Sequence, residues 1–145
     1  MKQARHIISV LLVPALLLVC AGCGAALKEA AKLEAYELGS ESVPSITAVV
    51  GEREVTGVES STNNGIASRQ YTYASASVYD DLWAYVQALM DDGWLVTQDI
   101  DLKTVPGSGQ LGKKSAEDGQ ILLVSFSYED AQYAIKVTKA KGTIE

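Results

Sequence analysis

The sequence predicts an α+β domain: a mostly antiparallel sheet of about five to six strands with one principal helix packed on one face. Three observations predict this fold. An amphipathic segment over about 78–92 has the period of a helix, Asn64-Gly65 separates two runs rich in β-forming residues, and 121–138 contains two more such runs. The expected order is β-β-α-β-(β)-β-β.

Before the helix, short strands are expected at 46–50, 55–61 and 67–76. Asn64-Gly65 is the strongest signal for a two-residue hairpin loop, because both residues tolerate positive φ. That loop predicts two cross-strand pairs on one face: Val58 with Tyr71, and Thr56 with Tyr73.

The helix is the clearest element. Ser77 and Asp80 have capping-box spacing, and Gly93 is placed to end the helix. At 100° per residue the apolar arc contains Val78, Tyr79, Leu82, Trp83, Tyr85, Val86, Leu89 and Met90. The polar arc contains Asp80, Asp81, Ala84, Gln87, Ala88, Asp91 and Asp92.

After the helix, residues 94–102 alternate as a strand with Trp94, Val96, Ile100 and Leu102 on one face, and 110–115 is a candidate edge strand. The last two strands are expected at 121–128 and 131–138. A loop centred on Glu129-Asp130 predicts three pairs on one face: Phe126 with Tyr133, Val124 with Ile135, and Leu122 with Val137.

Residues 1–22 have the three parts of an export signal. Lys2 and Arg5 form a short positive region, an apolar run covers 7–19, and Ala21 and Gly22 are small. The run is too short for a transmembrane helix, which needs roughly 20 residues.

The residues Val19-Cys20-Ala21-Gly22-Cys23 resemble the lipobox of bacterial lipoproteins. Cys20 departs from the pattern, since Leu is usual there. The resemblance implies cleavage before Cys23 and a diacylglycerol on its sulfur, which supplies the two chains that stable anchoring needs. The protein is then exported and held on the outer face of the bacterial cytoplasmic membrane, or in an outer-membrane leaflet if the source is Gram-negative. The alternative is a soluble secreted protein that is cut nearby.

The exported chain divides into a tether and a domain. Residues 23–43 are rich in helix formers and then in linker residues, which predicts a lipid-anchored, partly helical tether. Pro44 marks the expected start of a single domain over 44–145.

Removal of the signal leaves 123 residues with ten basic and 18 acidic side chains, a formal charge of −8. An acidic chain has no electrostatic attraction to phosphate backbones, so nucleic acid is not an expected partner and membrane attachment depends on the lipid. Since Cys20 is removed and Cys23 is lipidated, no disulfide is expected.

The residue composition also restricts which catalytic and metal sites the exported chain can form. His6 is the single histidine and leaves with the signal, so Ser-His-Asp, Cys-His and His-ligated zinc sites are excluded. The pairs Asp80-Asp81 and Asp91-Asp92 fall on the polar arc, and Asp99 and Asp101 are two carboxylates on one strand face, too few for calcium. Neither a cofactor nor a metal is expected.

Aromatic side chains are the other candidates for a site. Most fall on predicted core faces, but Tyr71 and Tyr73 share a face whose opposite side carries the small residues Ala74 and Ala76. We expect Tyr71 and Tyr73 to lie away from the helix and to contribute to a partner-binding patch. The alternative is that they fill the core beneath the helix.

These observations predict a surface-anchored, non-catalytic binding or protein-interaction module whose partner is an envelope protein or a glycan. One alternative is a small glycan-acting enzyme that uses carboxylates alone, which needs two of them close together in a cleft. Another is an inhibitor or immunity-type protein that occludes a partner.

Overall fold

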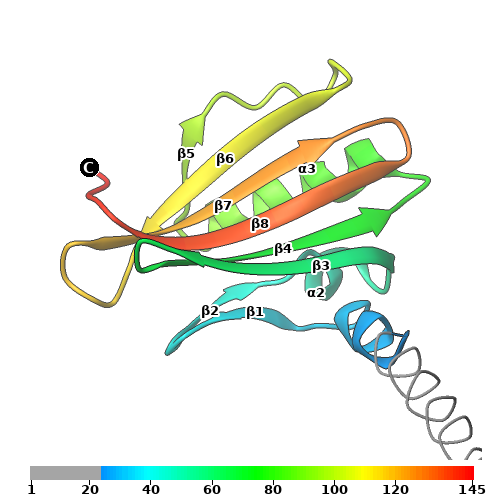
Figure 1. Ribbon diagram of the computed structural model, residues 1–145. Helices are drawn as coiled ribbons and strands as arrows, with labels where there is room; N and C mark the ends of the chain where they lie inside the picture. The colour runs from blue at the N-terminus through cyan, green and yellow to red at the C-terminus, as the bar shows by residue number, and fades with distance from the viewer. Residues whose placement is uncertain (1–23) are drawn as a thin grey trace, which may run out of the picture.

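The computed structural model describes residues 24–145, so the predicted signal and Cys23 lie outside the described residues. It is α+β, as expected (Figure 1). The main sheet is antiparallel with the order β3-β4-β8-β7-β6-β5, and β1 and β2 form a separate two-stranded sheet. The strands are β1 Ala35–Leu38, β2 Glu41–Pro44, β3 Glu54–Asn63, β4 Ile66–Ala74, β5 Leu95–Gln98, β6 Gly107–Lys114, β7 Gln120–Tyr128 and β8 Gln132–Lys141. The helices are α2 Ile46–Val50 and α3 Val78–Asp91, and residues 24–30 are also helical.

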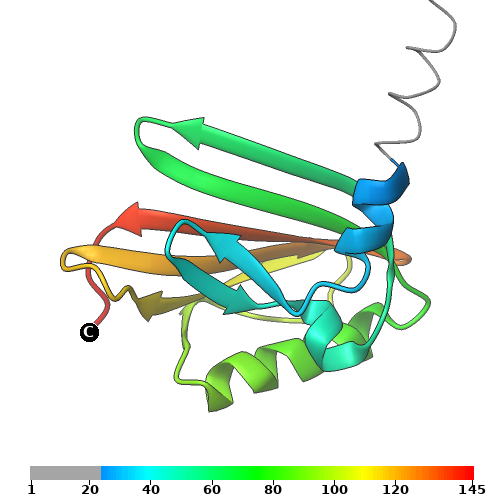
Figure 2. The same ribbon diagram turned by 90° about the horizontal axis from the view of Figure 1, so that it is seen from below.

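Helix α3 packs on one face of the main sheet, and Figure 2 shows α2 and the β1–β2 hairpin on the same side. The helix ends as predicted at Gly93, whose φ is 87°. The N–H of Trp94 donates to the Leu89 carbonyl over 3.0 Å, which completes a Schellman-type end. At the start Ser77 occupies the N-cap position but makes no side-chain cap bond, so the predicted capping box is wrong.

The N-terminal segment is part of the core. Tyr36, Leu38, Val43 and Ile46 are buried, and the ring of Tyr36 stacks on that of Tyr71 with centroids 4.6 Å apart. Even Ala30 and Ala31 are buried. The prediction of a tether over 23–43 is therefore wrong for most of that range, and the domain begins well before Pro44. The physical reason is that one helix is too narrow to cover a sheet of this width.

A polar contact fixes the far end of the β1–β2 hairpin. The Glu41 carboxylate accepts the Ser115 hydroxyl over 2.6 Å and the Ala116 N–H over 2.7 Å. The Lys139 ammonium lies 2.9 Å from Glu41 and also 2.9 Å from Glu117. These contacts attach the hairpin to the β6–β7 turn and to β8.

A helix stands where a strand was predicted at 46–50. The Ser45 hydroxyl oxygen accepts the Ala48 N–H over 3.0 Å, and the Thr47 hydroxyl donates to the Leu33 carbonyl over 2.7 Å. A side-chain cap offers the backbone a local partner, and here it outweighs the β preference of Ile46 and its neighbours.

The Asn64-Gly65 hairpin is confirmed. Asn64 and Gly65 have φ of 51° and 76°, and Val58 lies opposite Tyr71. The second predicted pair is wrong, because an irregularity between Val55 and Gly57 shifts the register and places Val55, not Thr56, opposite Tyr73. A bulge adds one residue to one strand, which sequence alternation alone does not reveal.

The last hairpin has the predicted faces but not the predicted register. Phe126 lies opposite Ile135, Val124 opposite Val137 and Tyr128 opposite Tyr133, a shift of two residues on β8. Because side chains alternate with a period of two, this shift keeps every apolar residue on the core face. The strand predicted over 94–102 is shorter than expected and ends at Gln98.

We predict that Glu41→Gln weakens folding and alters its pH dependence. The hydrogen bonds from Ser115, Ala116 and Lys139 lower the pKa of Glu41 from 4.5 to about 2. Stability from this carboxylate is therefore fully present above about pH 4.5 and is lost as the pH falls towards 2. At pH 7 the substitution should cost about 1–3 kcal/mol in urea unfolding.

The exposed neighbour Glu37 provides the matched control, since Glu37→Gln should unfold as the parent protein does. If the parent and Glu41→Gln lose stability equally between pH 5 and pH 3, the Glu41 contact does not hold the hairpin.

Candidate functional site

The expected aromatic patch does not form. Tyr71 and Tyr73 are 4% and 0% exposed, and their rings lie in the core on the side of the sheet that carries α3. The Tyr73 hydroxyl is 2.8 Å from that of Tyr36. The prediction that Tyr71 and Tyr73 lie away from the helix is therefore wrong. Their large rings fill the space beneath the N-terminal segment, which the sequence alone predicts to lie outside the domain.

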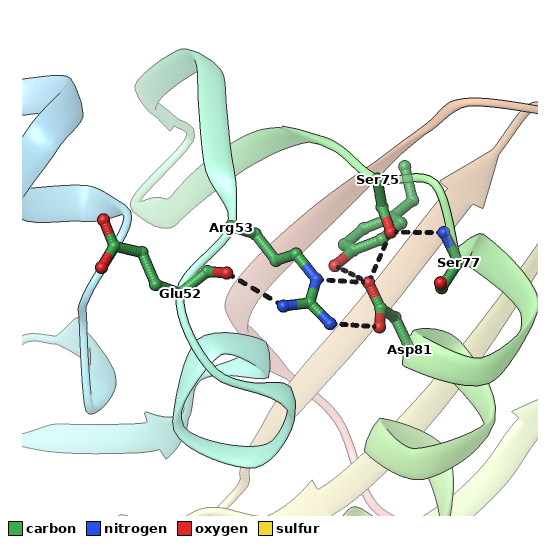
Figure 3. A network of polar contacts seen from close by, with 6 residues as sticks. Glu52, Arg53, Ser75, Ser77 and Asp81 are labelled. Atoms are coloured by element: carbon green, nitrogen blue, oxygen red, sulfur yellow. Dashed lines mark hydrogen bonds and ion pairs between the residues drawn. The ribbon is translucent and has the colours of Figure 1, made fainter.

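A buried carboxylate, that of Asp81, lies on the side of α3 that faces Arg53 and Ser75 (Figure 3). Asp81 is 3% exposed and accepts two hydrogen bonds of 2.8 Å from the Arg53 guanidinium. It also accepts the Ser75 hydroxyl over 2.7 Å and the Tyr133 hydroxyl over 3.0 Å. The prediction that Asp81 belongs to a solvated face is wrong, whereas Asp80, its neighbour, is exposed as expected.

The Asp81 network is structural in character. Burial alone would raise the pKa of Asp81, but the hydrogen bonds from Arg53, Ser75 and Tyr133 lower it below its ordinary value. The carboxylate thus stays charged with its oxygens engaged, which suits a positioning contact more than proton transfer. It joins α3 to the start of β3, to the β4–α3 connection and to β8, and so sets the rotation of α3 about its axis.

That rotation leaves three large side chains of α3 in solvent. Trp83, Tyr79 and Met90 are 51%, 46% and 46% exposed, although the sequence predicted all three for the core. At 100° per residue they share an arc of about 40°, and we call these three residues the α3 flank. The flank lies on the side away from α2, because Asp81 and Tyr85 on the other side of α3 bond to Arg53 and to the Pro44 carbonyl.

A cavity of about 320 Å³ lies beside the N-terminal part of the α3 flank. Its apolar lining includes Tyr79, Leu102 and Val105, and Val105 is 46% exposed. Three carboxylates also line it: Asp80, Glu129 and Asp130. We call this the α3 cavity.

A further exposed apolar side chain lies on the face of the sheet that carries α3. Val96 of β5 is 46% exposed and lies opposite the buried Leu111, which places it on the face of the sheet that carries α3. Large apolar side chains exposed together, with polar residues around them, mark interaction sites more often than single exposed residues do.

The opposite face of the sheet is a weaker candidate. It presents mainly small polar side chains, and several of these bond to one another: Ser61 with Ser68, Gln110 with Ser125, and Thr97 with Gln110. Antiparallel sheets commonly have one such solvated face, so this pattern needs no ligand to explain it.

Residues 24–145 contain no group of three or more His, Cys, Asp or Glu side chains placed to hold a metal ion. The Asp101 carboxylate is occupied locally, by the Lys103 N–H over 3.0 Å and the Thr104 hydroxyl over 2.7 Å.

No protein-family model matches the chain, and neither the curated proteins nor the solved structures give a significant match. Among residues 24–145, no helix is both long and apolar enough to cross a membrane.

We predict that Asp81→Asn destabilises the domain by about 2–4 kcal/mol, because it leaves the Arg53 guanidinium without its anion in a largely buried setting. Urea unfolding at pH 7 measures the loss. Asp80→Asn, one residue earlier and exposed, should be nearly silent. Equal unfolding midpoints for the two variants would show that the Asp81 network does not fix α3.

Proposed function

We propose that this chain is an exported lipoprotein, anchored through lipid on Cys23, whose domain is a non-catalytic binding module. The anchor is proposed from the export signal and the lipobox-like residues Val19 to Cys23. In this proposal the α3 flank is the surface that binds a partner in the cell envelope. The observation that carries the binding role is the exposure of Trp83 and Tyr79 side by side on one helix.

Exposure of these rings has a thermodynamic cost. Burying a large apolar side chain contributes roughly 1.5–3 kcal/mol. A partner that covers the α3 flank would therefore stabilise the complex by burying side chains that the domain alone leaves exposed. Trp and Tyr also dominate the energetic centres of protein interfaces. The exposed flank thus supports a binding role better than the small polar residues of the opposite sheet face do.

The short distance between anchor and domain supports a binder that works near the membrane. Residues 24–30 are helical, and Ala30 and Ala31 are already buried in the domain. Seven helical residues span only about 10 Å. With lipid on Cys23, the domain would therefore sit close to the membrane surface.

The glycan-acting alternative meets one of its requirements, since Asp80, Glu129 and Asp130 line the same cavity. All three are solvent-exposed, however, whereas a proton-donating carboxylic acid is usually made by an apolar enclosure. The binding role is for that reason the better supported of the two.

The anchor is tested by metabolic labelling with a fatty acid. We predict that Cys23→Ser abolishes acylation and leaves the precursor uncut or released, because the acceptor sulfur is gone. Cys20→Ser is the matched control and should label normally. Labelling that persists in Cys23→Ser would disprove the anchor.

The binding role is tested by a photo-reactive amino acid placed at position 83 in the full-length protein in its native cells. We predict a discrete cross-linked envelope partner that is weakened by Tyr79→Ala. The same group at Ile66, 40% exposed on β4, is the control and should give no such product. Identical products from both positions would contradict a binding role for the α3 flank.

A further inference from the structure

We propose that the occupant of the α3 flank and the α3 cavity is an amphipathic protein segment that carries basic side chains beside apolar ones. This inference rests on the proposed binding role and adds the chemistry of the partner. The observation that carries it is the combination of exposed Tyr79 and Val105 with three carboxylates in one cavity.

The apolar part of the surface has the dimensions of a peptide site. Tyr79 and Met90 are eleven residues apart on α3, which corresponds to roughly 16 Å along the helix axis. About three turns of a partner helix cover that length, and such a helix presents apolar anchors at three- and four-residue spacing. Val105 lines the α3 cavity with Tyr79 and extends the apolar surface beyond the helix, and Val96 is exposed on the same face of the sheet.

The charges around this surface are almost all of one sign. The bordering segments, 78–106 and 129–131, contain a single basic residue, Lys103. Asp81 is matched by Arg53, and Asp92 by Lys113 over 3.1 Å. The remaining acidic side chains there are Asp80, Asp91, Asp99, Asp101, Glu129 and Asp130. Complementary charge selects partners and steers their approach, so this border favours a basic segment.

The same charges argue against two other occupants. A second copy of the chain on a two-fold axis would bring these carboxylates against their own equivalents, which is unfavourable. An anionic lipid surface would be repelled for the same reason. A basic, amphipathic polypeptide satisfies both the apolar and the acidic parts of the surface.

The test uses residues 24–145 with Trp94→Phe, which leaves Trp83 as the single tryptophan. This range is the part of the chain that the structure describes, and it contains the complete main sheet with α3 and the N-terminal hairpin. The probe is an 18-residue amphipathic helical peptide of leucine and lysine, and the comparison peptide has glutamate in place of every lysine. We expect the leucine–lysine peptide to shift the emission of Trp83 to shorter wavelength and to bind more weakly as salt is raised. The leucine–glutamate peptide should leave the emission unchanged.

Two triple variants with equal charge change separate a specific site from general attraction to an acidic protein. Asp80→Asn, Glu129→Gln and Asp130→Asn together should raise the Kd about tenfold, since each exposed pair contributes a modest amount. Glu52→Gln, Glu54→Gln and Glu59→Gln together should leave the Kd within about twofold, because these side chains lie outside the α3 cavity.

Three results would overturn the inference. They are equal losses in the two triple variants, binding of the leucine–glutamate peptide as tight as that of the leucine–lysine peptide, and concentration-dependent dimers that vanish with Trp83→Ser. The proposed binding role would survive the first two, because cross-linking from position 83 tests it without any assumption about charge.

Discussion

The apolar face of the main sheet is wider than one helix, and this constraint explains most of the structure. Six strands at about 4.8 Å spacing give a width of about 29 Å, whereas a helix with its side chains is about 10 Å across. The β1–β2 hairpin and α2 cover the part next to α3 on the β4 side, where Tyr36 stacks on Tyr71. On the β5 side the loop over 99–106 packs Ile100 and Leu102 against the core, but no described helix or strand continues the cover beyond the α3 flank, and Trp83 is left in solvent.

Under this cover, four buried tyrosines have hydroxyl groups with protein partners. The hydroxyls of Tyr36 and Tyr73 bond to each other, Tyr85 donates to the Pro44 carbonyl, and Tyr133 donates to Asp81. Buried polar groups that are fully satisfied make the position of neighbouring elements specific, because any shift leaves a costly unpaired group. The hydroxyl bonds of Tyr36 and Tyr85 therefore place the N-terminal hairpin and α2, while that of Tyr133, with Arg53, places α3.

The elements that the sequence predicts best are those specified by neighbouring residues. The α3 helix, its end at Gly93 and the Asn64-Gly65 hairpin depend on local pattern and turn chemistry, and the structure confirms them. The covering role of Tyr36 and Val43 was missed, because their short strands carry little alternation and face residues far along the chain. The fold class could thus be predicted, but not the full extent of the domain.

The candidate site was predicted poorly for a related reason. The eight apolar residues of α3 span an arc that is wider than the part of a helix that one sheet can bury. The sequence pattern alone does not show which edge of that arc stays exposed. Asp81 decides this through Arg53, which lies 28 positions earlier. The one sequence signal for this role was the position of Asp81, a polar residue at the border of the apolar arc. Its burial depends on partners that are distant in the sequence.

Native-state hydrogen exchange, read on peptides from residues 35–44, tests the central claim that the N-terminal hairpin and the sheet form one cooperative core. An isolated two-stranded sheet is at best marginally stable in water. If they do form one core, these peptides exchange as slowly as peptides of β4 and β8 do, because all of them exchange through opening of the whole domain. Exchange of 35–44 that is orders of magnitude faster, with β4 and β8 still protected, would contradict this claim and make the hairpin a separable cover.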